Sequence, residues 1–211
     1  ALIVTYSRNS LIKEIPKEKH YLFWTSYLLC VAGLLGVTIT GDAFNTFVFL
    51  EISSLSTYIL IAMGSDKRAL LASYRYLIMG TIGATFIVLG VGLLYALTGT
   101  LNLLDIAERI GDVTDSRTKL AALAFLLVGI SLKLALFPLH AWLPNAYTYS
   151  PSVASTFLAA TSTKVGIYLL IRFSFDIFGA TKSFENLGIS QLLMFLSIIA
   201  IIYGSVAAIF E

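Results

Sequence analysis

The stretch SLKLALFPLHAWLPNAY, residues 131–147, decides how this sequence folds. Lys133 lies inside an apolar run, and Pro138, His140 and Pro144 follow it. Both features are costly in an apolar helix, because a charge loses its hydration there and proline removes a backbone hydrogen bond. We therefore expect the surroundings of this stretch to supply polar partners.

Composition indicates that these surroundings are a membrane. Of 211 residues, 58% are hydrophobic and 12% are charged, and the mean hydropathy of +0.88 is well above that of an average soluble domain. The net charge of +2 is too small to predict nucleic-acid binding. The single cysteine, Cys30, gives no disulfide framework or metal-ligand spacing and is interpreted as a small buried apolar residue.

Six windows are long and apolar enough to cross a membrane as helices, which takes roughly 20 residues each. The ten-residue alternation of membrane-spanning strands does not occur. The sequence therefore predicts an all-α polytopic membrane protein with six transmembrane helices, one of them broken at about 131–147. The windows are 21–39, 43–63, 70–97, 120–143, 152–171 and 187–210.

The distribution of lysine and arginine predicts the orientation, because short cytoplasmic loops carry an excess of both. Segments 8–20 and 64–69 carry more of them than segment 98–119 and are expected in the cytoplasm. The predicted location is the cell membrane, with an organellar inner membrane as the alternative. The stretch LNLLDIAERI, 101–110, is either a short surface helix or a solvated loop. The basic residues of the first face are Arg8, Lys13, Lys17, Lys19, Lys67 and Arg68.

Three ionisable residues lie far from the ends of the predicted spans: Glu51, Lys133 and Lys164. Each costs on the order of 2.5 to 3.5 kcal/mol at the centre of a bilayer. Arg75 and Arg172 differ, since each is close enough to a helix end to reach the headgroups. Charges at such a cost indicate a functional interior.

Helical periodicity places these charges on three polar stripes, which suggest one continuous internal seam. Either Glu51 and a lysine pair only to hold helices together, or the charges form an ion pathway. Interhelical polar contacts in membranes contribute only about 0.6 kcal/mol, and a second lysine exceeds what one pair needs, so the pathway is favoured. The stripes are Glu51, Ser54 and Tyr58; Lys133 and His140; and Thr161, Lys164 and Tyr168.

The prolines support the same interpretation. Pro138 cannot donate to the carbonyl of Leu134, and Pro144 cannot donate to that of His140. Free carbonyls survive at membrane depth only where protein or a water-filled cavity satisfies them. We expect both prolines to break the helix beside an ion site, the alternative being a kink selected for packing.

Four segments together resemble one family: NTFVFLEISSLSTYIL (45–60), YLIMGTIGATFIVLGVGLLYALTGTLNL (76–103), KLALFPLHAWLPNAY (133–147) and STKVGIYLLIRF (162–173). They are similar to the antiporter-like membrane subunits of respiratory complex I, Mrp-type sodium/proton antiporters and membrane-bound hydrogenases. The resemblance runs from about residue 4 to the last residue. The most specific piece is PLHAWLPNAY, with a lysine seven residues before its histidine.

The resemblance implies that the spans are the fourth to ninth helices of a longer subunit with two inverted five-helix repeats. Residues 1–20 would be a stub and cytoplasmic loop, 21–173 the first ion-translocation repeat, and 174–211 a loop and the start of the second. Matching motifs imply a proton relay of Glu51, Lys133, His140 and Lys164, in which the glutamate controls the first lysine. The lysine at 164 resembles the D-type subunits of Mrp complexes more than the largest type.

The predicted function is translocation of protons, or of protons and sodium, by an antiporter-like subunit of a larger complex. Its expected partners are other membrane subunits and the lipid bilayer, with no cofactor or metal site. No catalytic chemistry is predicted for the chain itself, so any redox step would belong to partner subunits of an NADH:quinone oxidoreductase or hydrogenase type. Two alternatives stay open: a self-sufficient secondary transporter for a small solute, and a structural membrane subunit that conducts nothing.

Overall fold

The computed structural model describes residues 2–113, 117–179 and 189–210. Three parts of the sequence-based interpretation lie outside this description: the side chain of Arg8, residues 114–116 of segment 98–119, and segment 180–188. Within the described residues the regular secondary structure is helical, apart from an isolated antiparallel bridge between Asp42 and Asn102. The predicted all-helical class is therefore confirmed for this part of the chain.

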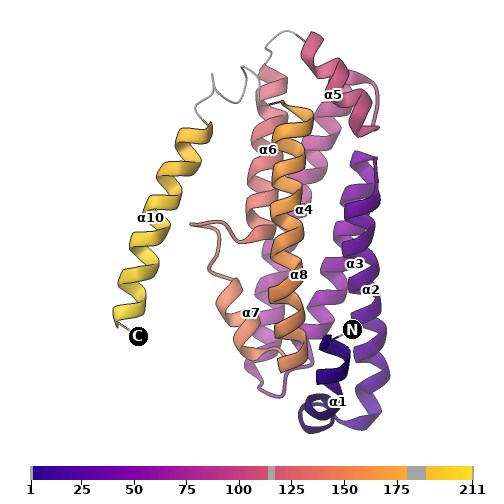
Figure 1. Cartoon of the computed structure of the whole chain (residues 1–211), viewed down its shortest axis with the longest axis vertical. Coiled ribbons are helices and arrows are strands. Elements are labelled where there is room, and N and C mark those ends of the chain that lie inside the picture. Colours follow the sequence, from indigo (N-terminus) through magenta and orange to yellow (C-terminus); the bar gives the residue numbers. More distant parts are fainter. Residues whose placement is uncertain (1, 114–116, 180–188, 211) are drawn as a thin grey trace.

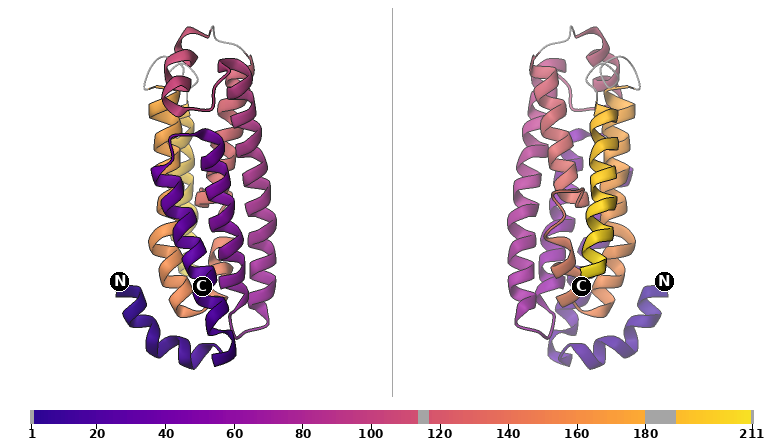
Figure 2. Two further views of the ribbon diagram at one scale, coloured as in Figure 1. Left: turned by 90° about the vertical axis from the view of Figure 1, so that its right-hand side faces the viewer. Right: turned by 90° about the vertical axis from the view of Figure 1, so that its left-hand side faces the viewer.

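Long helices run side by side along the long axis of the molecule (Figure 1), with short helices at both ends. In Figure 2 the bundle is seen from two further sides, with α1 bent away at one end. The elements are α1 (Leu2–Glu14), η1 (Lys17–Lys19), α2 (His20–Ile39), α3 (Ala43–Ala62), α4 (Arg68–Thr98), α5 (Leu103–Asp112), α6 (Arg117–Leu134), α7 (Leu143–Tyr149), α8 (Ser152–Ile171), η2 (Arg172–Ile177) and α10 (Ile189–Phe210).

Five described helical segments are long and apolar enough to cross a membrane: Lys17–Ile39, Ala43–Ala62, Arg68–Thr98, Ser152–Ile177 and Ser190–Phe210. The sixth predicted window, 120–143, is not among them. Its helix, α6, ends at Leu134 in the middle of the window and carries Arg117, Lys119 and Lys133. Five of the six predicted spans are therefore supported as continuous helices.

Glycines allow α4 and α6 to pack closely. A Cβ added to Gly129 would lie 2.7 Å from the carbonyl oxygen of Gly83 and 2.7 Å from Ile87. A Cβ on Gly90 would lie 2.6 Å from Leu126. Small residues let helices approach in membranes, where packing replaces the hydrophobic driving force. This contact fixes the position of the last turns of α6, where Lys133 lies.

Helix α6 ends at a backbone reversal. Ala135 has a φ of 58°, in the left-handed region that usually belongs to glycine. The N–H of Leu136 donates to the carbonyl of Ser131 at 2.9 Å, and that of Ala135 donates to Leu132 at 3.4 Å. This pair of bonds is the Schellman pattern, which satisfies carbonyls that a helix end leaves free.

The prolines therefore act differently from the sequence-based hypothesis. The helix has already ended when the chain reaches Pro138, whose peptide bond with Phe137 is cis. Pro144 lies in the first turn of α7, where a missing N–H breaks no helical bond. The carbonyl of His140, expected to be free, accepts the N–H of Leu143 at 2.9 Å. Pro144 thus helps to start a helix.

Most of segment 101–110 lies in helix α5, Leu103–Asp112, so the loop alternative is wrong. The Asn102 side chain caps it, accepting the N–H of Leu104 at 2.9 Å. Leu103, Ile106 and Ile110 are buried, whereas Leu104 is exposed. This spacing gives α5 one apolar face, which covers the end of the bundle.

The predicted N-terminal stub contains a helix. Leu11 and Ile15 are buried, and Glu14 reaches the start of α8. Its carboxylate accepts the backbone N–H of Ser152 at 2.7 Å and the hydroxyl of Ser10 at 2.8 Å. Burial alone would raise the pKa of the Glu14 carboxyl, but these hydrogen bonds outweigh burial and hold the pKa below its usual value. Glu14 therefore caps a helix that begins 138 residues later.

We expect Gly129→Ala to lower the thermal stability of the protein in detergent. The added methyl would press on Gly83 and Ile87, and overpacking of this kind costs about 1–3 kcal/mol. The matched control is Gly92→Ala, because nothing lies within 4 Å of a Cβ added at Gly92. Alanine is the better helix former by about 1 kcal/mol, so the control should be as stable as the parent or more so. Equal melting temperatures for the two variants would contradict the close contact.

We expect Glu14→Ala to weaken the start of α8 by about 1 kcal/mol, the usual effect of losing a helix cap. Because the folded-state pKa of Glu14 is lowered, its contribution is present above the ordinary carboxyl pKa and is lost as the pH falls through the folded-state value. Hydrogen exchange at the Ser152 amide measures both effects. Glu18→Ala, at an exposed position in η1, should leave that exchange rate unchanged; equal rates in both variants would contradict the cap.

Candidate functional site

Lys133 and Glu51 form an ion pair inside the bundle. The Lys133 ammonium nitrogen lies 3.0 Å from Oε1 of Glu51 and donates to the Ser54 hydroxyl oxygen at 2.7 Å. The side chain of Lys133 is 7% exposed and that of Glu51 is 24% exposed. The amine is therefore enclosed, and the carboxylate is its more accessible partner.

Two helices position the three side chains. Glu51 and Ser54 are one turn apart on α3 and face the same side. Lys133 lies in the last turn of α6, where the negative end of the helix dipole favours a cation. Ser54 itself is buried. The predicted meeting of acid and amine is thus present, and the serine from the same predicted stripe completes the contact.

Tyr58, the third member of that stripe, lies near Glu51 and Ser54, but its buried hydroxyl forms no hydrogen bond with any residue that the structure describes. Its hydroxyl lies against Gly80 of α4. Its ring packs edge-on against Tyr76 at 5.1 Å between centroids, and Tyr76 packs against Trp142 at 4.6 Å. This aromatic row joins α3 and α4 to the segment that follows the end of α6.

Trp142 has a role that the sequence analysis missed. Its indole N–H donates to the carbonyl of Leu132 at 3.2 Å. The segment after α6 therefore folds back and satisfies a carbonyl next to Lys133. In the sequence, only the motif AWLP hinted at this role, because an indole N–H in an apolar run needs a hydrogen-bond acceptor. The motif does not show which carbonyl would accept it.

His140 lies in the connection between α6 and α7. Its ring is 5.3 Å from that of Phe137 and 5.7 Å from that of Tyr203 on α10. Its Nδ1 is buried and makes no hydrogen bond with any residue that the structure describes. Among those residues, no hydrogen bond joins His140 to Lys133 or Glu51.

Lys164 does not join the pair. It is exposed on α8, and its ammonium donates to the carbonyl of Ala159 and to the hydroxyl of Thr163. Helix α8 meets the end of α6 where a Cβ added to Gly166 would lie 2.7 Å from the Cβ of Leu134. Lys133 is next to Leu134 and Lys164 is two residues from Gly166, so both lysines flank this contact between α6 and α8. Their side chains nevertheless bind different partners.

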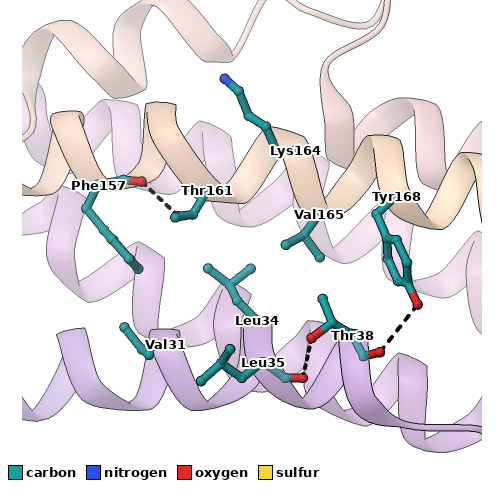
Figure 3. Close-up of a pocket in the computed structure, with 9 residues that line it drawn as sticks. All are labelled: Val31, Leu34, Leu35, Thr38, Phe157, Thr161, Lys164, Val165 and Tyr168. Atoms are coloured by element: carbon teal, nitrogen blue, oxygen red, sulfur yellow. Dashed lines mark hydrogen bonds between the residues drawn. The ribbon is translucent and has the colours of Figure 1, made fainter. Parts of the chain in front are cut away.

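The third predicted stripe is divided by the packing of α8 on α2. These helices border a cavity of about 370 Å³. The Tyr168 hydroxyl donates to the carbonyl of Thr38 at 3.3 Å. Lys164 also lines the cavity, but its ammonium end points away from α2 (Figure 3). Val165 lies between them and faces α2. The described contacts therefore do not form the continuous polar seam that periodicity suggested.

Arg172 lies where α8 passes into η2. It lies over the ring of Tyr168, 5.7 Å from the centroid, and its Nη1 is buried. With Asn102 and Asp176 it lines a cavity of about 210 Å³ beside α5.

Cys30 is buried as predicted, with its sulfur 3.4 Å from the Thr57 hydroxyl. Among the described residues, no three His, Cys, Asp or Glu side chains converge as metal ligands would.

Sequence comparisons relate the chain to membrane proteins of known complexes. It is 46% identical over 206 residues to the N subunit of an NADH-quinone oxidoreductase from Desulforudis audaxviator, covering 98% of this chain and 40% of the relative. It is 33% identical to the D-type component of a Na⁺/H⁺ antiporter from Alkalihalophilus pseudofirmus, covering 92% of this chain and 38% of the relative. The chain thus spans about two fifths of the length of these relatives.

A solved structure supports the relation. A chain of an archaeal respiratory membrane complex, the membrane-bound sulfane sulfur reductase, is 34% identical and superposes with a TM-score of 0.75. That match covers 82% of this chain and 34% of the other. The model of the transmembrane family described as NADH:quinone oxidoreductase/Mrp antiporter matches residues 40–211. The chain belongs to the NADH:quinone oxidoreductase/Mrp antiporter family of membrane proteins.

Proposed function

We propose that this chain translocates protons, or protons and sodium, as an antiporter-like subunit of a larger membrane complex. The observation that carries the proposal is the enclosed contact of Lys133 with Glu51 and Ser54 at the end of α6. A buried amine with one acidic partner can hold or release a proton as that partner approaches or withdraws. Family membership supports the same function.

In the proposed mechanism, Glu51 is the moving partner. Its side chain is the more exposed of the two, so it can leave the contact without opening the enclosure around Lys133. While the carboxylate is close, it stabilises the ammonium. When the carboxylate withdraws, a buried ammonium has lost its counter-charge and passes its proton on.

The onward route in this proposal leads toward Lys164. The contact between Leu134 and Gly166 keeps the two helices close at the level of the lysines. His140 is the intermediate donor and acceptor, since the buried Nδ1 has no partner among the described residues. Because Lys164 is exposed and turned away from Lys133, ordered water or a side-chain rotation must close the remaining distance.

In this proposal the present chain contributes six transmembrane spans to the complete protein. One span is broken and consists of α6, the connection after it and α7. Residues 1–20 would precede the first repeat, 21–173 would form it, and 174–211 would begin an inverted second repeat. The partners are other membrane subunits and the bilayer, the transported ions are H⁺ or H⁺ and Na⁺, and the location is the cytoplasmic membrane. The length of the relatives supports a larger protein.

One observation favours a structural role instead. Glu51 and Lys133 are in direct contact, as they would be if they only joined α3 to α6. Removing one partner of a buried pair typically costs about 3–5 kcal/mol. A purely structural pair would therefore be detected as a loss of assembly, whereas an ion pathway would be detected as a loss of transport.

We expect Lys133→Ala to abolish ion translocation in membrane vesicles while the complex still assembles. Proton movement is followed by quenching of a pH-sensitive dye, and assembly by native gel electrophoresis. Lys67→Ala, on an exposed loop, is the control and should behave like the parent. Loss of assembly with Lys133→Ala would favour the structural role, and unchanged transport would refute the proposed pathway.

We expect Lys164→Ala to slow translocation roughly a hundredfold, the lower range for loss of a positioned proton-transfer group. Lys164→His should retain much of the rate, because imidazole can carry the proton in place of the amine. The same vesicle assay compares the two variants. An alanine variant that translocates as fast as the parent would remove Lys164 from the route, whatever the result for Lys133.

A further inference from the structure

A cavity of about 130 Å³ lies between the first turns of α4 and helix α7, at the end of the bundle that carries Lys67 and Arg68. It is separate from the Lys133 site. Polar and apolar side chains of both helices line it. These are Arg68, Leu71, Ala72, Arg75, Asn145 and Tyr149.

Tyr149 positions the side chain of Arg68, which forms one wall of the cavity. Nη1 of Arg68 donates to the Tyr149 hydroxyl oxygen at 3.1 Å, and the guanidinium carbon lies 5.1 Å from the centre of that ring. Nε of Arg68 lies 3.3 Å from the carboxylate of Asp66. These contacts occupy part of the guanidinium and fix its direction, while leaving further N–H groups for a ligand.

Two further polar side chains face the cavity from α4 and α7. Arg75 is two turns beyond Arg68 on α4, a rise of about 10 Å. Neither Arg75 nor Asn145 forms a hydrogen bond or ion pair through its side chain with any residue that the structure describes. The cavity therefore combines two guanidinium groups and one amide, with an excess of donors and positive charge.

This set of donors fits a phosphate. Guanidinium groups bind phosphate oxygens through paired N–H groups, and the cavity has room for about four water molecules at roughly 30 Å³ each. Leu71, which lines the cavity, also belongs to an apolar strip of α4. Leu71, Tyr74 and Ile78 are 51%, 58% and 40% exposed and lie on one side of the helix, around Arg75.

A phosphate beside an apolar strip is the pattern of a phospholipid. The basic end of the bundle is the end expected at the cytoplasmic leaflet, where anionic lipids are enriched and basic pockets between helices bind their headgroups. We propose that Arg68, Arg75 and Asn145, with Tyr149 positioning Arg68, bind the phosphodiester of an anionic glycerophospholipid. One acyl chain of that lipid lies along Leu71, Tyr74 and Ile78.

The test uses the full-length chain, purified in the assembly in which it is expressed and placed in lipid nanodiscs. Spin-labelled phosphatidylglycerol and phosphatidylcholine are compared by the fraction of each lipid that the protein immobilises. We expect a preference for phosphatidylglycerol that Arg75→Gln lowers about fivefold, the effect of one basic residue at a membrane surface. Asn145→Leu should lower it as well, without a change of charge.

The matched control is Lys19→Gln, which removes one charge from the same end of the bundle at an exposed position outside the cavity. It should leave the preference unchanged. An equal loss in Lys19→Gln and Arg75→Gln would reduce the effect to general surface charge and overturn the site. Displacement of the lipid by excess inorganic phosphate would overturn a lipid in favour of a free anion. An unchanged preference in both cavity variants would also overturn the proposal, because the lipid preference would then arise elsewhere on the protein.

Discussion

The enclosed ammonium of Lys133 is the constraint on which the rest of this structure depends. A cation at membrane depth must have partners, and here α3 supplies a carboxylate and a hydroxyl from Glu51 and Ser54. That requirement fixes the relative rotation of α3 and α6. The glycines of α4 let it pack closely on α6, and Gly83 lies beside Leu132 and Lys133 in this contact.

The end of α6 serves the same cation. A helix terminus offers carbonyl groups and a negative dipole, so ending the helix one residue beyond Lys133 favours the charge that a continuous helix would have to bury unaided. The free carbonyls that result are satisfied by the backbone reversal at Ala135 and by the indole of Trp142. The broken span and the ion pair are therefore parts of one arrangement.

Sequence reasoning predicted what depends on composition and periodicity. It identified the apolar helices, the pairing of Glu51 with Lys133, and helix α5 as one of two alternatives. It missed features that depend on backbone conformation or on distant contacts. Nothing in the sequence marks Ala135 as left-handed, and the Glu14 cap joins segments 138 residues apart. The separate direction of Lys164 follows from the packing of α8 on α2 and α6, which periodicity along one helix does not determine.

The left-handed backbone of Ala135 adds an energetic cost at the helix end beside Lys133. This conformation costs a residue with a Cβ roughly 1–2 kcal/mol, a cost that glycine avoids. Two backbone bonds and the indole bond of Trp142 compensate for it. The position of the helix end beside Lys133 consequently depends on those three bonds, because without them the cost of the left-handed residue is no longer offset.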